Sequence, residues 1–278
     1  MKLSRFLTTP TGGVTRASAP VSEEQTIPTD PGTILAIALD VGAETLRVGG
    51  EVHRVEDTVT RICRAYGAAH VEVFSIISVI NAAIRMPDGS YSSQMRRVKS
   101  TSNDLYRLEL YNEISRSICR ETPALAEFDE RLHAVKKKRA YPAWVTIPAS
   151  ALAASSFAVF FGGGLFECLI AVVIGALVGV IDLALGNHLN DLAKIIISSF
   201  VAGFLSSLAS VLWSSVNSGE IMIGTIMLLV PGVAFGTALR DLLCGDLIAG
   251  SLKTLQAILA ALMIAFGYIL SMAAIGAV

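Results

Sequence analysis

An acidic residue stands inside a long apolar stretch of the sequence. Asp182 is the one charged residue between positions 168 and 190. An ionised side chain is costly in hydrocarbon, so such a residue usually faces a cavity or a partner. A carboxylate that takes up a proton on one side of a membrane and releases it on the other would make Asp182 a coupling residue. The alternative is that it lies within one turn of the membrane surface and reaches water from there.

A second apolar stretch contains the pair Pro231 and Gly232. Proline removes a helical hydrogen bond and glycine permits unwinding, and the backbone groups freed in this way bind small solutes in many transporters. We therefore predict that these two residues line a solute pathway. The alternative is a structural kink, with Gly232 and Gly236 forming a packing face of small residues. Gly175 and Gly179 have the same spacing and are predicted to serve packing.

Three charged residues follow this stretch: Arg240, Asp241 and Asp246. An arginine can bind a carboxylate through two parallel hydrogen bonds. The cluster is thus a candidate for a cytoplasmic gate or solute vestibule. The alternative is ordinary charge at the membrane surface.

A fourth candidate group lies in the first half of the chain, where Glu51, Arg54, Glu56 and Asp57 occur together. Paired carboxylates beside an arginine can perform acid–base chemistry, so a membrane-anchored hydrolase with its site at Glu51 to Asp57 is one hypothesis. No nucleophile accompanies them. A contact between the soluble part and the membrane part is the use that we favour.

Other chemistry has no support in the sequence. The four cysteines and four histidines are dispersed, which predicts no metal site. No phosphate-binding glycine loop and no nucleophile motif is present, which argues against ATP-driven transport by this chain alone. We predict no cofactor and expect that the chain is not an enzyme, with the hydrolase as the alternative. The net charge of -1 excludes a strongly basic nucleic-acid-binding protein.

The distribution of charge predicts how the chain is divided. Of the 45 charged residues, 36 precede position 143. The first thirty residues are rich in Thr, Pro, Gly and Ser, which is typical of disorder. We predict a disordered tail over residues 1–30, a small cytosolic α+β domain over 31–140 and a transmembrane domain of five helices over 141–278.

Five apolar stretches are long enough to cross about 30 Å of hydrocarbon. The predicted spans are 143–161, 165–185, 195–216, 221–239 and 254–277. Lys and Arg near spans favour the cytoplasm. The basic cluster from Lys136 to Arg139, together with Lys194, Arg240 and Lys253, falls on one side of this arrangement, whereas Glu167 and Glu220 fall on the other. We therefore expect a multi-pass protein with its N-terminus in the cytoplasm and its C-terminus outside.

The soluble half is predicted to be mixed. Apolar residues recur at helical spacing after Asp30 and Pro31, and again from about residue 51 to 66. Residues 71–98 are rich in β-branched side chains around the turn Pro87 to Ser90, which predicts about three antiparallel strands. A helix capped by Asn103 or Asp104 and a last helix from about Pro123 follow.

Two stretches together resemble the threonine/serine exporter family: ALDVGAETLRVGGEVHRVEDTVTRICRAYG at 38–67 and LVPGVAFGTALRDLLCGDLIAG at 229–250. The matching positions include Glu51, Arg54 and Glu56 in the first stretch. In the second they include the pairs Pro231–Gly232 and Arg240–Asp241, and Asp246.

This resemblance implies export of threonine, serine or a dicarboxylate across the cytoplasmic (inner) membrane, driven by an ion gradient. The chain is similar to the larger subunit of the split form of the family, which works with a second small membrane subunit. A homo-oligomer is the other possibility, and a regulatory scaffold for a partner transporter is the alternative function.

Overall fold

The computed structural model describes residues 30–138, 141–186 and 189–276. The predicted tail, apart from Asp30, and Arg139 of the basic cluster lie outside these ranges. The described residues form ten helices and three strands. We call residues 30–138 the α+β unit and residues 141–276 the helical bundle.

The α+β unit contains the predicted antiparallel sheet, whose strands follow the order β1-β2-β3. Acidic residues cap the N-termini of two of its helices. The Asp30 carboxylate accepts hydrogen bonds from the first turn of α1, and Asp104 caps α3 in the same way. The elements are α1 (Pro31–Arg47), α2 (Val52–Ala65), β1 (His70–Ile76), β2 (Val79–Arg85), β3 (Tyr91–Arg97), α3 (Leu105–Glu121) and α4 (Leu125–Lys137).

One face of the sheet is covered and the other is open. Ile80, Ala82 and Ile84 alternate along β2 and are buried on the face that packs against α1 and α2. On the opposite face, Phe74 and Met95 lie in one cross-strand row and are exposed. The core of the α+β unit therefore lies between the sheet and its helices.

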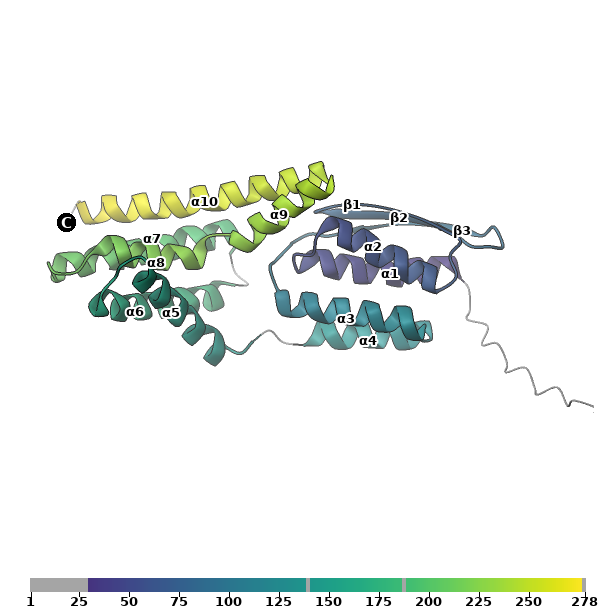
Figure 1. Ribbon diagram of the computed structural model, residues 1–278, viewed down its shortest axis with the longest axis horizontal. Helices are drawn as coiled ribbons and strands as arrows, with labels where there is room; N and C mark the ends of the chain where they lie inside the picture. Colours follow the sequence, from purple (N-terminus) through teal and green to yellow (C-terminus); the bar gives the residue numbers. More distant parts are fainter. Residues whose placement is uncertain (1–29, 139–140, 187–188, 277–278) are drawn as a thin grey trace, which may run out of the picture.

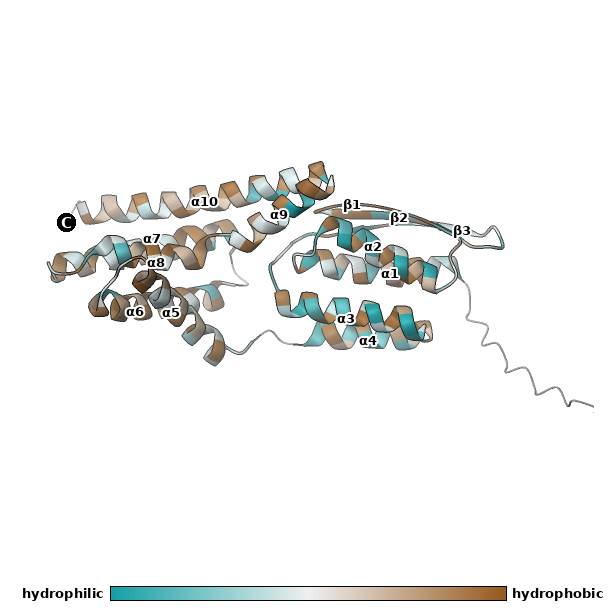
Figure 2. Cartoon of the chain, viewed as in Figure 1, coloured by the Kyte–Doolittle hydropathy of each residue, from teal (hydrophilic) through white to brown (hydrophobic). Residues whose placement is uncertain are grey.

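The helical bundle is mainly apolar, as Figure 2 shows by its brown ribbons beside the teal surfaces of α2, α3 and α4. Among the described residues, four helices are long and apolar enough to cross a membrane, and a bent pair would make a fifth. The helices are α5 (Ala143–Phe160), α6 (Leu165–Leu185), α7 (Asp191–Leu212), α8 (Ser218–Leu229), α9 (Gly232–Cys244) and α10 (Leu247–Gly276).

The fourth predicted span, 221–239, differs from the structure in one respect. It is not one helix but two, α8 and α9, with a bend of 53° between them. Proline at position 231 cannot donate the next helical hydrogen bond, which ends α8. The helix is therefore fully interrupted at Pro231, which goes beyond the structural kink that the sequence offered as an alternative.

Glycines bring the bundle helices close together. A Cβ atom on Gly224 would lie 2.7 Å from the Ala158 backbone nitrogen of α5, and one on Gly175 would lie 2.6 Å from the Ala154 side chain. The predicted packing role of Gly175 is confirmed. By contrast, a Cβ on Gly232 or Gly236 would meet no described atom within 4 Å, so these two glycines do not pack against a described helix of this chain.

The bundle and the α+β unit lie end to end, with α9 and the start of α10 beside α2 (Figure 1). The 30 residues of α10 rise about 45 Å, more than the hydrocarbon thickness of a bilayer. Its first turns extend to the α+β unit, where Ala249 joins the core cluster of that unit. The two parts therefore share a packed interface.

Candidate functional site

The break between α8 and α9 is a tight turn centred on Pro231. The Gly232 amide donates to the Val230 carbonyl at 2.8 Å, and Pro231 has φ -76° and ψ 55°, which is an inverse γ-turn. Because Pro231 has no N–H, the Met227 carbonyl loses its helical donor. The turn therefore leaves backbone acceptor capacity in the middle of a predicted span.

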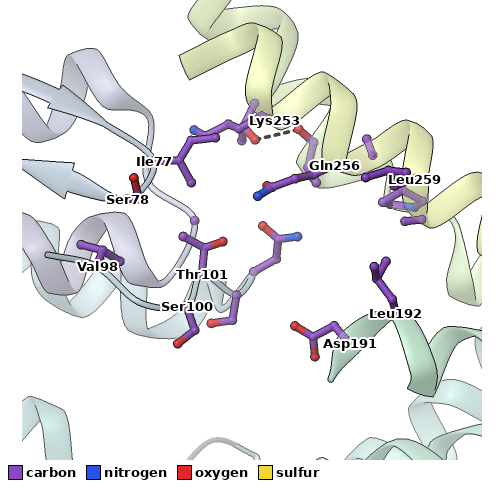
Figure 3. Close-up of a pocket in the computed structure, with 18 of the residues that line it drawn as sticks. Ile77, Ser78, Val98, Ser100, Thr101, Asp191, Leu192, Lys253, Gln256 and Leu259 are labelled. Atoms are coloured by element: carbon purple, nitrogen blue, oxygen red, sulfur yellow. Dashed lines mark hydrogen bonds between the residues drawn. The ribbon is translucent and has the colours of Figure 1, made fainter. Parts of the chain in front are cut away.

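A cavity of about 510 Å³ lies beside this turn, between the α+β unit and the bundle. We call it the interface cavity. Pro231 and Thr237 of the broken helix line it, together with Lys253 and Gln256 of α10 and Asp191 at the start of α7. Ser100 and Thr101 of the α+β unit line the same space from the other side (Figure 3). The cavity is thus built by both parts of the chain.

A second cavity, of about 330 Å³, lies on the other side of the break. Asp182 lines it, as do Leu228 and Leu229 at the end of α8. We call it the Asp182 cavity. Asp191 and Ile195 line both cavities, so the two are neighbours across the first turn of α7.

Asp182 lies in the last turn of α6 and is exposed rather than enclosed. Near it, the Lys194 ammonium lies 2.6 Å from the Asp191 carboxylate. Asn190 caps α7, since its side-chain oxygen accepts a hydrogen bond from the Ala193 amide. The predicted coupling residue therefore opens onto a cavity that also contains an ion pair.

Asp241 makes the contact that joins α9 to the α+β unit. One carboxylate oxygen accepts a hydrogen bond from the Val52 amide at 3.2 Å, and the other accepts one from the Lys253 ammonium at 2.6 Å. Lys253 also donates to the Gly50 carbonyl. Only 1% of the Asp241 side chain is exposed. Asp241 therefore caps α2 from a distant part of the chain, and Lys253 balances its charge.

Arg240 and Glu51 form the adjacent ion pair. The arginine Nη1 lies 2.5 Å from the Glu51 carboxylate. Glu51 stands at the N-cap position of α2 but makes no capping hydrogen bond with its own side chain. In this structure Arg240 therefore binds a carboxylate of the chain itself rather than that of a solute. The pair lies at the contact between the α+β unit and the bundle, which is the use of Glu51 that we favour from the sequence.

The remaining members of the predicted groups lie apart. Glu56 accepts hydrogen bonds from the backbone and side chain of Ser75 on β1. Burial raises the pKa of Glu56, and the negative charge of Asp246 raises this pKa further. Asp57 pairs with Arg61, and Arg54 is exposed. The four residues from Glu51 to Asp57 therefore do not converge on one point.

Asp246 lies just before α10. Its Oδ2 atom is buried and has no hydrogen-bond partner among the described residues. The negative charge of Asp246 raises the pKa of Glu56, so the two carboxylates disfavour each other's ionised form.

At the opposite end of the bundle, acidic residues tie two links together. The Glu167 carboxylate accepts hydrogen bonds from the Gly164 amide and from the Asn217 amide. The Asn217 side chain in turn donates to Glu220. The described cations of the bundle, Lys194, Arg240 and Lys253, instead lie on elements that meet at the end near the α+β unit.

Sequence reasoning missed several residues of the site. From the sequence, Lys253 indicates only the orientation of the chain, and Lys99, Ser100, Thr101 and Gln256 have no predicted role. An isolated lysine or threonine carries no pattern that distinguishes a cavity wall from a solvated loop. These residues become a site only when the two halves of the chain come together.

Comparison with known proteins adds an independent observation. A family model described as “Putative threonine/serine exporter” matches residues 36–275. Among curated proteins, the chain is 23% identical over 237 residues to “Pheromone-regulated membrane protein 10” of Eremothecium gossypii. It is 28% identical over 195 residues to an uncharacterized protein of Schizosaccharomyces pombe. No solved structure matches the chain.

These alignments cover most of this chain but a small part of the relatives. They include 82% of this chain and 31% of the Eremothecium protein, and 67% of this chain and 24% of the Schizosaccharomyces protein. The chain thus spans about a quarter to a third of the length of these curated relatives.

Proposed function

The chain belongs to the threonine/serine exporter family, and we propose from this premise that it exports a small amino acid or a dicarboxylate. The observation that carries the proposal is the break at Pro231, which lies between two cavities. A discontinuous helix near the middle of a bundle offers unpaired backbone groups to a solute and a hinge for movement. Threonine, serine and succinate are the solutes to test.

The proposed cycle is alternating access driven by an ion gradient. The solute enters the interface cavity, passes the turn at Pro231 and Gly232, and leaves from the opposite end of the bundle. Asp182 takes up and releases the coupling proton, because its carboxylate is exposed to the second cavity. Arg240, Asp241 and Asp246 act as the gate: Arg240 and Asp241 hold α9 against α2, and Asp246 lies between α9 and α10.

We also propose an orientation and a partner. The α+β unit lies in the cytoplasm as a domain of residues 31–140, and residues 141–278 form the domain embedded in the cytoplasmic membrane. The grouping of Lys194, Arg240 and Lys253 near the α+β unit supports this, because cations near spans favour the cytoplasm. The exporter works with a second small membrane subunit or as a homo-oligomer. The mass of the complex purified from its native membrane distinguishes the two.

The proposal is tested by efflux from vesicles loaded with threonine, serine or succinate. We expect Pro231→Ala and Asp182→Asn each to reduce efflux about tenfold or more, since a loss of about 1.4 kcal/mol is a factor of ten. Gly236→Ala is the matched control in the same helix pair, because its new methyl group meets no described atom within 4 Å.

Two results would contradict the proposal. If both Pro231→Ala and Asp182→Asn export at the wild-type rate, the proposed pathway is wrong and a regulatory scaffold is favoured. Efflux that is unchanged when the proton gradient is dissipated would remove the proton coupling alone.

A further inference from the structure

The wall of the interface cavity on the side of the α+β unit is a short connection between β3 and α3. We call residues 99–103 the β3–α3 link. Backbone hydrogen bonds hold it in place: Val98 donates to the Ser78 carbonyl at 2.8 Å, and Ser102 donates to the Arg47 carbonyl at 2.7 Å. All five residues of the link line the cavity. A polar connection is thus fixed at the entrance of the proposed pathway.

The polar side chains of this link are available to a ligand. Within the part of the chain that the structure describes, no hydrogen bond forms from the side chains of Lys99, Ser100, Thr101 or Asn103. Lys99, Ser100 and Asn103 are exposed and Thr101 is half-buried, so their polar groups are open to solvent. Gln256 of α10 lies across the cavity (Figure 3).

The charges around the cavity are unequal. Lys253 is balanced by Asp241 at 2.6 Å, and Asp191 is balanced by Lys194 at the same distance. Lys99 has no acidic partner within 4.0 Å among the described residues. The cavity therefore presents one unbalanced cation, on the side formed by the link, and this favours an anionic group.

We propose that the β3–α3 link selects the solute: Lys99 attracts a carboxylate, and Thr101 and its polar neighbours hydrogen-bond to it. This inference rests on the proposed function and gives the α+β unit a direct part in solute recognition. An amino acid and a dicarboxylate both supply the carboxylate. The solute must carry one carboxylate, which binds to the β3–α3 link, and a second polar group that reaches the opposite wall of the cavity.

The test is binding of L-threonine, L-serine and succinate to the purified full chain in lipid nanodiscs, measured by calorimetry. We expect Lys99→Gln and Thr101→Val each to weaken binding of the recognised solute about tenfold, because each variant removes a hydrogen bond to the charged carboxylate. L-Threonine methyl ester, which lacks the carboxylate, should not bind. The probe that binds the wild type identifies the source of the carboxylate.

Two matched variants control for general effects. Lys137→Gln removes an exposed lysine outside the cavity, and Ser93→Ala removes a hydroxyl from the open face of β3. Both should bind as the wild type does, and all four variants should keep the melting temperature of the solute-free protein.

The outcomes separate this inference from the proposed function. Wild-type affinity in both Lys99→Gln and Thr101→Val, or no binding of any of the three probes, overturns the inference. If efflux is then still lost in Pro231→Ala, the proposed exporter stands without a selecting link. If efflux is unchanged in Pro231→Ala and Asp182→Asn while the link variants lose binding, the exporter pathway is wrong and the link is a binding site of another kind.

Discussion

Asp241 shows how one buried carboxylate determines the contact between two parts of the chain. It receives a backbone N–H from Val52 and the ammonium of Lys253. A buried ion pair adds little net stability by itself, because both charges lose water. Removing only one member of the pair is strongly destabilising, because the other member stays buried and charged without a partner.

We therefore predict that Lys253→Met destabilises the protein by about 3–5 kcal/mol. The double variant Asp241→Leu, Lys253→Met should recover part of this loss, since no unpaired charge then stays buried. Denaturant unfolding in detergent, followed by circular dichroism, measures both. Equal stability of Lys253→Met and the wild type would show that the pair is open to water.

Glu56 gives a prediction about pH. Burial and the charge of Asp246 raise its pKa in the folded protein. The stability that Glu56 contributes is fully present below its ordinary, unfolded-state pKa, where it is protonated in both states, and is lost as the pH rises through the raised value. Folding is thus penalised at neutral pH by the ionised Glu56 carboxylate, which is half-buried and repelled by the charge of Asp246.

Glu56→Gln should remove this penalty, because an amide oxygen still accepts the hydrogen bond from the Ser75 backbone. We expect a higher melting temperature than the wild type at pH 7 and the same melting temperature near pH 4. The exposed Glu130→Gln is the control. A lower melting temperature of Glu56→Gln at pH 7 would mean that the ionised form is the one the contact requires.

At the scale of elements, local chemistry predicted most of the fold. The cap at Asp30, the antiparallel strands and the breaking residue Pro231 follow from neighbours within a few positions, so the sequence contains their cause. The interactions between elements do not. The pairing of Arg240 with Glu51 joins residues 189 positions apart, and no periodicity distinguishes it from an arginine at a membrane surface.

Close packing at glycines could be predicted only in part, because it also depends on which element lies opposite. The spacing of Gly175 and Gly179 indicated a packing face, whereas Gly224 has no glycine partner at that spacing and still lies directly against α5. Conversely, Gly232 and Gly236 have the spacing, but a Cβ on either would meet no atom within 4 Å in the part of the chain that the structure describes. The spacing of glycines within one helix indicates which face of that helix carries small residues, but it does not indicate which element packs against that face.

This contrast predicts opposite effects of one methyl group. Gly224→Ala should destabilise the bundle by about 1–3 kcal/mol, because the new Cβ would lie 2.7 Å from backbone atoms of α5. Gly236→Ala should stabilise α9 by about 0.5–1 kcal/mol, since alanine favours a helix and space is free. Unfolding of the two variants in mixed micelles measures the difference. A neutral Gly224→Ala would indicate that α5 and α8 separate easily.

At the scale of the whole molecule, charge and length agree on one arrangement. The described cations of the bundle lie toward the α+β unit, Glu167 and Glu220 lie at the other end, and α10 is longer than a bilayer core requires. The two cavities follow one another across the broken helix between these ends.

The orientation that we propose predicts where reporters will work. Alkaline phosphatase fused after Gly276 should be active and green fluorescent protein fused there should be dark, because the proposed orientation places Gly276 outside the cytoplasm. A fluorescent protein fused before the chain should be bright. The reverse pattern at Gly276 would contradict an odd number of crossings or the cytoplasmic position of the α+β unit.

The distant cap of α2 also has a consequence for biosynthesis. Val52 leaves the ribosome 189 residues before Asp241, an interval of about 10–40 s at ordinary rates of translation. During that time the first turn of α2 lacks the carboxylate that caps it, so this end of the helix frays in the nascent chain. The cap forms only after α9 has been made and placed against α2. The final structure of the first half of the chain therefore depends on correct insertion of the second half.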